Sequence, residues 1–244
     1  MADILELKNV SFSAQDQVIV RDFSYQYEEG KTTALTGPSG GGKSTVLKLS
    51  AGLLVPSHGE VIYKGRNIAH MSRKENLEFR EEGAFVFQDS ALWANQSLFQ
   101  ILELPLLVHF PGMSAAEREK RIQETLAAVG YKKELNIRPS MLSMGEQKLI
   151  GFARAMVCRP RLLFLDEWTE SLDDSAANRL VRLVKNRQEA HETILFVSHD
   201  LRIIRNLADN VLMILGGELS RTFTREQLNS DEDLALYLEK GIAS

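Results

Sequence analysis

Residues 37–45, Gly-Pro-Ser-Gly-Gly-Gly-Lys-Ser-Thr, constrain this chain more than any other stretch. They follow a short run that contains β-branched residues, 32–36, and lead into an amphipathic stretch, 46–53. A glycine-rich loop can turn its backbone N–H groups inward around an anion, because no side chains block that approach. The positive end of the following helix points to the same place. The order strand, loop, helix therefore predicts a phosphate-binding loop on an α/β fold.

Two side chains of this loop have roles that its GxxxxGK[ST] pattern predicts. Lys43 should reach the β- and γ-phosphates of a nucleotide, and the Ser44 hydroxyl should ligate Mg²⁺. The predicted nucleotide site consists of Gly37, Pro38, Ser39, Gly40, Gly41, Gly42, Lys43, Ser44 and Thr45.

The composition is that of an ordinary globular chain, with 244 residues of which 44% are hydrophobic and 25% charged. A net charge of −4 gives no broad basic field, so we expect no nucleic-acid partner. The single cysteine, Cys158, fits a reducing cytoplasm because it cannot form an internal disulfide. The sequence begins without the pattern of a signal peptide, and no apolar run approaches the ~20 residues of a membrane span. We expect a cytoplasmic chain whose membrane role is peripheral.

Strands should alternate with helices in the core. The run 84–87 is continuously apolar, as expected for a strand buried on both faces. The apolar runs 162–165 and 194–197 predict two more strands, joined by a helix over about 175–187. This alternation predicts a mostly parallel sheet. Shorter strands are predicted near the N-terminus, at 4–7, 18–20 and 61–65.

The stretch between the strands at 84–87 and 162–165 has helical character. Apolar residues recur at helical spacing up to Pro105, which should break that helix. A capping box, Ser114–Glu117, opens a second helix that should end at Gly130. A third helix should run to about Cys158. We interpret 89–158 as a helical subdomain inserted into the α/β core.

Polar residues follow several predicted strands and should converge on the phosphate loop, because ligands bind at the carboxyl ends of parallel strands. They are Gln88, the acidic pair Asp166 and Glu167, and His199. Asp166 can hold the Mg²⁺ shell, and Glu167 can polarise an attacking water. An acidic pair alone is more often a solvated turn or a helix cap. The strictly apolar run before it and the phosphate loop upstream favour the catalytic interpretation.

With these residues in place, the chain resembles the ATP-binding cassette (ABC) ATPases over nearly its whole length. The motifs stand in the family's order: the phosphate loop, the Q-loop at Gln88, a signature-like Leu142-Ser143-Met144-Gly145-Glu146, the acidic pair, a D-loop at Ser171-Leu172-Asp173 and the switch histidine His199. The resemblance implies a single ABC ATPase domain over 1–244. An N-terminal antiparallel β subdomain and a RecA-like P-loop NTPase core would occupy 1–88 and 159–244, and the helical subdomain 89–158.

The resemblance also implies a composite site that needs ATP, Mg²⁺ and a second copy of the chain. In this family two cassettes dimerise head to tail, so that each ATP lies between one phosphate loop and the partner's signature. Ser143, Met144, Gly145, Glu146 and Asp173 would then act in trans. Within one copy, Ser44, Gln88 and Asp166 are implied as Mg²⁺ contacts, Glu167 as the catalytic base and His199 as the γ-phosphate sensor. A Ser-x-Gly turn at a helix start is also an anion site on physical grounds, although an N-cap serine explains most such turns.

Three positions depart from the family pattern. Met144 stands where glycine is usual, which affects how closely the backbone can approach the γ-phosphate. Trp168 follows the acidic pair where proline is usual. The aromatic residue that normally stacks on adenine should fall near Ala14, which cannot stack. Phe12 is the nearest substitute. Because successive side chains of a strand point to opposite faces, Phe12 could equally lie in the core.

The Q-loop region suggests a subclass of the family. Residues 87–93 and 103–106 resemble ATPases of phospholipid-transporting, lipid-asymmetry (Mla-type) systems, in which an Ala-Leu-aromatic step and a Pro-Leu pair occupy these positions. The same apolar stretch could simply pack the helical subdomain. We predict the ATP-hydrolysing subunit of an ABC transporter, peripheral to the inner face of the cell membrane, with transmembrane permease subunits as partners and lipid as one candidate cargo.

Two other classes of protein share parts of this pattern. A non-transport ABC ATPase, acting on a membrane or on a ribosomal or DNA complex, usually carries two cassettes or a long coiled-coil insertion, and neither is visible. A phosphate-loop nucleotide kinase is disfavoured by the signature and the D-loop.

Contact with a membrane subunit is implied in a groove beside the Q-loop. We expect residues 89–99 to line it, with Leu92, Trp93, Leu98 and Phe99 as large apolar side chains. Trp93 is the expected anchor, because interface hot spots favour large aromatic residues. The alternative is a buried Trp93 that only packs the helical subdomain.

Overall fold

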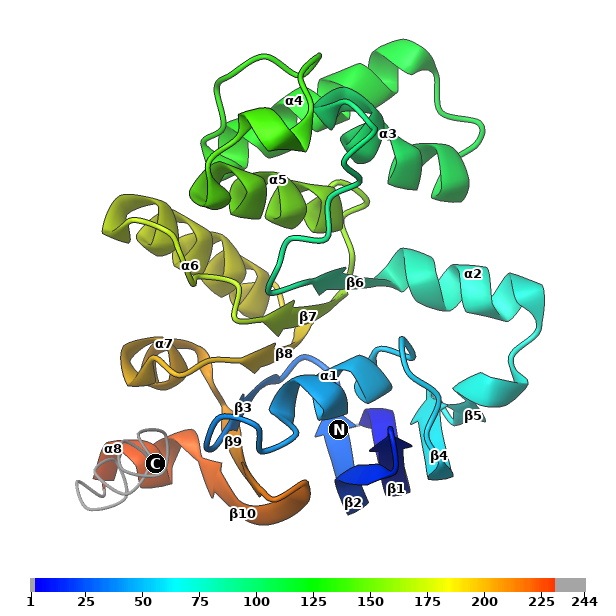
Figure 1. Cartoon of the computed structure of the whole chain (residues 1–244), viewed down its shortest axis with the longest axis vertical. Helices are drawn as coiled ribbons and strands as arrows, with labels where there is room; N and C mark the ends of the chain where they lie inside the picture. The colour runs from blue at the N-terminus through cyan, green and yellow to red at the C-terminus, as the bar shows by residue number, and fades with distance from the viewer. Residues whose placement is uncertain (1–2, 231–244) are drawn as a thin grey trace.

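A six-stranded sheet runs through the middle of the molecule (Figure 1). The computed structural model describes residues 3–230. The strand order is β10-β9-β3-β8-β7-β6, and only β10 runs antiparallel to its neighbour. The strands are β3 (Thr32–Thr36), β6 (Gly83–Val86), β7 (Leu162–Asp166), β8 (Thr193–Val197), β9 (Asn210–Leu215) and β10 (Glu218–Thr224). Every residue of β3, β7 and β8 is buried, as expected for parallel strands covered on both faces. The predicted mostly parallel sheet is confirmed.

A second, antiparallel sheet is formed near the N-terminus. Its order is β2-β1-β4-β5, with β1 (Asp3–Ala14), β2 (Gln17–Glu28), β4 (His58–Tyr63) and β5 (Arg66–Asn67). β1 and β2 are longer than the predicted strands at 4–7 and 18–20. Positive φ angles at Asn9 (49°) and Asp22 (43°) accompany register shifts along this pair, so the hydrophobic pattern is interrupted although pairing continues. Helix α1 (Lys43–Ser50) contacts strands of both sheets and fills the space between them (Figure 1).

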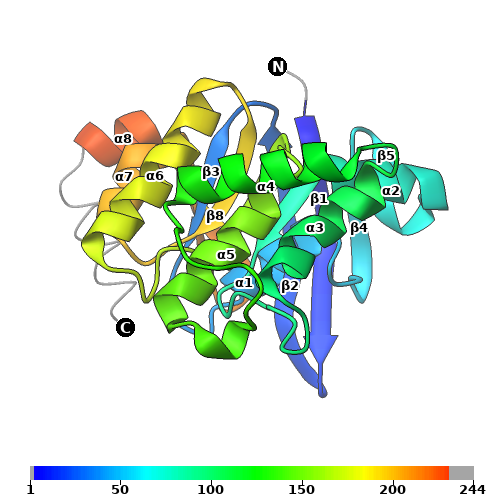
Figure 2. The same ribbon diagram turned by 90° about the horizontal axis from the view of Figure 1, so that it is seen from above.

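Three helices pack against one another beyond the β6 edge of the large sheet (Figures 1 and 2). They are α3 (Leu98–His109), α4 (Ala115–Val129) and α5 (Met144–Met156). Each begins with a capping box, including the predicted Ser114–Glu117 box, and α4 ends at Gly130 in the left-handed conformation as predicted. All three lie within 89–158, the interval that we interpret as the helical subdomain. Of the interval 159–244, which we interpret as part of the core, residues 231–244 lie outside the described residues.

Further helical elements along the chain are η1 (Ile68–His70), α2 (Arg73–Glu82), η2 (Pro139–Met141), α6 (Asp174–Glu189), α7 (Leu201–Leu207) and α8 (Arg225–Ser230). Of these, η2 lies between α4 and α5, α8 follows β10, and the others each lie between two strands. No helix within residues 3–230 is both long enough and apolar enough to cross a membrane.

Two local predictions were wrong. Pro105 does not end its helix, because α3 continues to His109. A proline inside a helix removes one hydrogen bond, and the burial of Ile101, Leu102 and Leu106 on the same helix offsets that loss. The run 84–87 is not fully buried on both faces: most residues of β6, which is the edge strand of the sheet, are only partly buried.

Candidate nucleotide site

The phosphate loop lies between β3 and α1, and two of its glycines are required by the backbone. Gly37 has φ 136°, and a Cβ atom there would lie 2.2 Å from the carbonyl oxygen of Ile214. Gly42 has φ 94°, and a Cβ atom there would lie 2.9 Å from the carbonyl oxygen of Ile19. Both positions combine a left-handed backbone with a close approach, which only glycine accommodates.

The first turn of α1 has free backbone N–H groups. Its N-cap is Gly42, which has no side chain to accept a hydrogen bond from them. Helices α2, α3, α4, α5, α6 and α7, in contrast, each begin with a side-chain cap. Unpaired N–H groups at a helix N-terminus bind anions. The loop and the start of α1 therefore form an anion site.

Lys43 folds back over the loop. Its Nζ donates to the carbonyl oxygens of Gly37, at 3.0 Å, and Pro38, at 2.8 Å, and the residue is buried. Burial lowers the pKa of Lys43, whereas the charges of Glu167 and Asp166 act to raise it. The ammonium is therefore held over the loop, where it could donate hydrogen bonds to a bound phosphate.

An oxygen-rich group lies beside the loop. The Ser44 hydroxyl donates to Asp166 Oδ1 at 2.7 Å, and burial raises the pKa of Asp166. Gln88 follows β6 and donates through Nε2 to Glu170 Oε2 at 2.9 Å. A hydroxyl, a carboxylate and an amide oxygen are suitable Mg²⁺ ligands. The described residues contain no group of three His, Cys, Asp or Glu side chains able to hold a metal ion.

Glu167 has the most unusual environment of the predicted residues. Its φ is 42°, a sparsely populated value for a residue other than glycine. Oε1 lies 3.1 Å from His199 Nε2, but this geometry is not that of a hydrogen bond and leaves Oε1 buried without a partner. Burial, with the charges of Asp166 and Glu170, raises the pKa of Glu167 to about 7. Burial and the charge of Lys43 lower the pKa of His199. A carboxylate in this state can accept a proton from water near neutral pH.

These residues surround one cleft of about 580 Å³. Its lining includes seven predicted residues: Ser39, Gly40, Lys43, Ser44, Gln88, Glu167 and His199. Asp166 lies beside it through its hydrogen bond with Ser44. The lining also includes four residues that sequence reasoning missed: Thr169, Glu170, Ser198 and Asp200. Each lies within three positions of Glu167 or His199 in the sequence, so the turns that follow β7 and β8 were the available signal.

The predicted trans residues are absent from the lining of this cleft. Ser143 caps α5, and its Oγ accepts from the Glu146 backbone N–H, while Met144 is 71% exposed. Gly145 lies beside the D-loop, because a Cβ atom there would be 3.3 Å from the carbonyl oxygen of Ser171. Asp173 caps α6 and accepts from the Ala176 N–H at 2.8 Å. The signature and the D-loop thus lie together, apart from the cleft of their own chain.

The adenine-stacking candidate has a different environment. Phe12 is half-buried on β1, packs against the core between α1 and the N-terminal sheet, and does not line the cleft.

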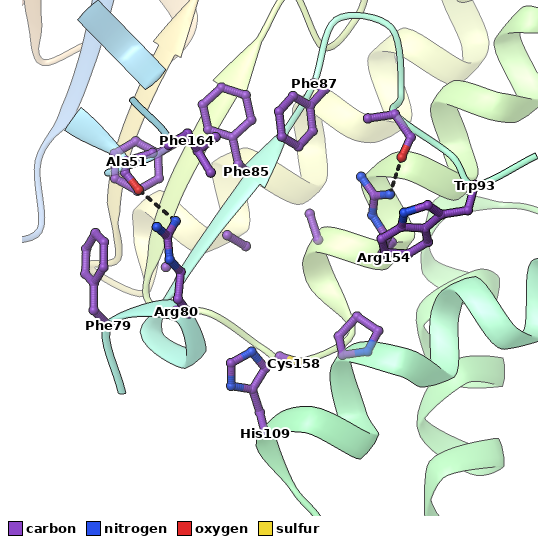
Figure 3. A pocket seen from close by; sticks show the side chains of 16 residues that line it. Ala51, Phe79, Arg80, Phe85, Phe87, Trp93, His109, Arg154, Cys158 and Phe164 are labelled. Atoms are coloured by element: carbon purple, nitrogen blue, oxygen red, sulfur yellow. Dashed lines mark hydrogen bonds between the residues drawn. The ribbon is translucent and has the colours of Figure 1, made fainter. Parts of the chain in front are cut away.

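A second cavity, of about 590 Å³, lies between the β6 edge and the helices α3 and α5 (Figure 3). Aromatic side chains dominate its wall: Phe79, Phe85, Phe87, Trp93 and Phe164. Trp93 is 45% exposed, and the Arg154 guanidinium lies 5.3 Å from its ring centroid. Arg154 also donates to the carbonyl oxygen of Ala91 at 2.6 Å.

The expected lining of this groove was only partly right. Trp93 lines the cavity, and the alternative of a buried Trp93 is wrong. Leu98 is fully buried in the core, and Leu92 and Phe99 pack against it rather than lining the cavity. The first turn of α3 turns Leu98 inward, and the aromatic wall comes instead from α2, from β6 and the residue after it, and from β7.

The fold and this site define a class. A phosphate loop before an uncapped helix, with an acidic pair and a histidine across the cleft, is the arrangement of a nucleotide-hydrolysing P-loop protein. The family model described as "ABC transporter" matches residues 20–170, and the chain belongs to this family.

Relatives and solved structures agree with that assignment. The Haemophilus influenzae intermembrane phospholipid transport system ATP-binding protein MlaF is 33% identical over 95% of this chain and 88% of its own. The Shigella flexneri nickel import ATP-binding protein NikE is 34% identical over 93% of this chain and 87% of its own. An uncharacterized Escherichia coli ABC transporter ATP-binding protein, YejF, is 36% identical over 83% of this chain, which spans only 39% of that relative.

The solved structures include the dimeric ATP-binding cassette MJ0796 in a post-hydrolysis state bound to ADP and Pi. It has a TM-score of 0.84 and 29% identity, with 91% of this chain and 99% of that chain covered. The chain is an ABC cassette with ATPase activity, and a homodimer is consistent with that structure.

Proposed function

We propose that two copies of this chain bind ATP head to tail and that hydrolysis at their interface drives transport through membrane partner subunits. One observation carries the proposal: a single copy has a cleft with Lys43, Glu167 and His199, while Ser143 lies at another surface. A second copy, turned head to tail, would bring its Ser143 to the open side of that cleft.

Within the composite site each side chain has a distinct role. The phosphate loop and Lys43 bind the phosphates, and Ser44, Asp166 and Gln88 supply oxygen atoms for Mg²⁺. When bound, Mg²⁺ would neutralise charge on the phosphate oxygens. Glu167 accepts a proton from the attacking water through its unpartnered Oε1. His199, whose Nε2 lies 3.1 Å from that oxygen, contacts the γ-phosphate.

The partner's signature requires a change at the start of α5. The Ser143 hydroxyl donates to Glu146 Oε2 at 3.1 Å, and Lys133 forms an ion pair with Glu146 at 2.5 Å. Binding a γ-phosphate would redirect the Ser143 hydroxyl from Glu146 to the phosphate. Lys133 then screens the Glu146 carboxylate from the added negative charge.

The aromatic cavity supports a docking site for an apolar segment of a membrane subunit. It is lined by Phe87, the residue before Gln88, so the cavity and the nucleotide cleft share one strand end. A segment seated in the cavity against Trp93 would lie beside Phe87, and Phe87 would couple that segment to the adjacent residue Gln88 in the nucleotide cleft. Docked in this way, the cassette lies at the inner face of the cell membrane.

The cargo depends on the membrane partner. A phospholipid cargo is supported by the relative MlaF, whereas NikE, with nearly the same identity, is named for nickel import. Fold-level similarity does not select between these cargoes.

The experiment is affinity purification of the tagged chain from the membranes of its native cell, followed by assay of the complex. We expect membrane-spanning subunits to co-purify and ATP to be converted to ADP and phosphate, with activity lost in Lys43→Ala. Recovery of the chain without any membrane-spanning partner would contradict the transport proposal. Transfer of phosphate to a nucleotide acceptor would instead favour a kinase.

A further inference from the structure

Lys148 is a buried lysine that no role above uses. It lies on α5, five residues after Ser143, and is 3% exposed. Its Nζ donates to two backbone carbonyl oxygens, that of Gln88 and, at 3.2 Å, that of Glu167. Burying an ammonium is costly unless it is hydrogen-bonded and electrostatically compensated. The negative charges of Glu170, Asp166, Glu167 and Asp89 compensate it here.

The two carbonyl groups belong to the residues that follow neighbouring strands. Gln88 follows β6 and Glu167 follows β7, and these strands pair in parallel. Both residues also point side chains into the nucleotide cleft. One ammonium therefore fixes the spacing between two backbone segments whose side chains belong to the proposed hydrolytic site.

The same helix holds these segments at further points. Phe152, one turn after Lys148, packs with its ring centroid 5.9 Å from that of the fully buried Trp168, which follows Glu167 directly. Gly151 approaches the Q-loop so closely that a Cβ atom would lie 3.2 Å from the carbonyl oxygen of Ser90. The buried face of α5 thus fits both segments along its length.

We propose that Lys148 is a positioning residue, which holds the backbone of Gln88 and Glu167 to α5. The inference rests on the proposed function. Because Ser143 begins the same helix and binds the nucleotide of the other copy, α5 links the two composite sites. Contact between Ser143 and the ATP bound by the other copy would fix the position of α5. Lys148 would then fix the position of the Glu167 backbone in its own chain. The lysine touches neither nucleotide, so it acts through geometry.

The test compares Lys148→Met, which keeps the length of the side chain without its donors, with Lys148→Arg, which keeps a cation and several donors. We expect Lys148→Met to lower kcat by about 10–100-fold, the range for loss of a group that orients a catalytic residue, with KM within about threefold. Lys148→Arg should recover most of kcat. The control Lys120→Met, at an exposed position on α4, should match the parent.

A second readout separates positioning from folding and assembly. In the Glu167→Gln background, Lys148→Met should still form an ATP-dependent dimer, because the binding contacts remain while hydrolysis is already absent. A kcat within about twofold of the parent would overturn the proposal, and so would a loss of kcat that only parallels loss of folded, ATP-binding protein. If Lys148→Met does not fold, Lys148→Gln, which keeps one amide donor, takes its place with the same criteria. A parent chain that neither hydrolyses ATP nor dimerises would instead contradict the proposed function.

Discussion

At the scale of single residues, Glu167 combines three features that each cost stability. Its backbone has a positive φ, its carboxylate is largely buried, and Oε1 lacks a hydrogen-bond partner. Such features persist where a function requires them. The folded chain raises the pKa of Glu167 from 4.5 to about 7, so it binds a proton at this carboxylate more tightly than the unfolded chain does. The stability gained from that protonation is fully present below pH 4.5 and is lost as the pH rises through 7.

The first prediction follows from this loss of stability at high pH. Glu167→Gln removes a buried charge, so the nucleotide-free variant should unfold at a higher temperature than the parent at pH 8, by about 3 °C or more, as expected for ~1 kcal/mol in a chain of this size. The difference should shrink at pH 5, where Glu167 is protonated. Thermal unfolding in EDTA at both values measures this, with the exposed Glu189→Gln on α6 as control. Equal melting temperatures at pH 8 would show that the charge is compensated.

The second prediction concerns Met144, the first residue of α5. Its exposed side chain takes up space where the partner's γ-phosphate should approach. Met144→Gly should raise ATP-dependent dimerisation or ATPase activity by roughly threefold, or ~0.65 kcal/mol, while the added backbone freedom costs about 0.5–1 kcal/mol of stability. Steady-state hydrolysis against ATP concentration measures this. Met141→Gly, at a position 72% exposed in η2, is the matched control. Unchanged or lower activity in a folded Met144→Gly protein would indicate that the methionine is accommodated.

At the scale of elements, local signals were predictable and tertiary ones were not. The Ser114–Glu117 box and Gly130 bound α4 as the sequence indicated, because caps depend on neighbouring residues alone. The prediction that Pro105 ends its helix was wrong, because burial of one face of α3 outweighs the lost hydrogen bond. The run 84–87 looks the same in sequence whether its strand is central or at an edge, so the position of β6 was hidden. The cleft residues were found because parallel strands end at one edge, whereas Lys148 had no motif to mark it.

The third prediction concerns Trp93, which lines the aromatic cavity. Trp93→Ala removes a large aromatic group from the cavity wall without opening the core, because the residue is 45% exposed. The variant should fold and hydrolyse ATP alone, but lose at least about tenfold in affinity for the membrane partner or in partner-stimulated turnover, as expected for an interface hot spot. Co-purification and stimulated ATPase assays measure this. Val55→Ala, at a position 76% exposed outside the cavity, serves as control. Normal coupling in Trp93→Ala would place the docking site elsewhere.

At the scale of the whole molecule, the proposed function gives a single copy two half-sites on different surfaces. The cleft offers the phosphate loop, Glu167 and His199, and the start of α5 offers Ser143 beside the D-loop. Neither half encloses a nucleotide alone, so ATP should act as part of the interface between two copies. Helix α5 spans the distance between the halves within each chain. This arrangement predicts that two copies dimerise only when ATP is bound.

Sedimentation of Glu167→Gln with and without Mg²⁺ and ATP tests that claim most directly, because the variant binds ATP but should not hydrolyse it. We predict a particle of twice the mass of one 27.4 kDa chain with ATP and a single chain without it. Adding Ser143→Arg should restore the monomer, since the arginine fills the space of the γ-phosphate contact. A Glu167→Gln protein that is saturated with ATP and still sediments as a monomer would contradict the account.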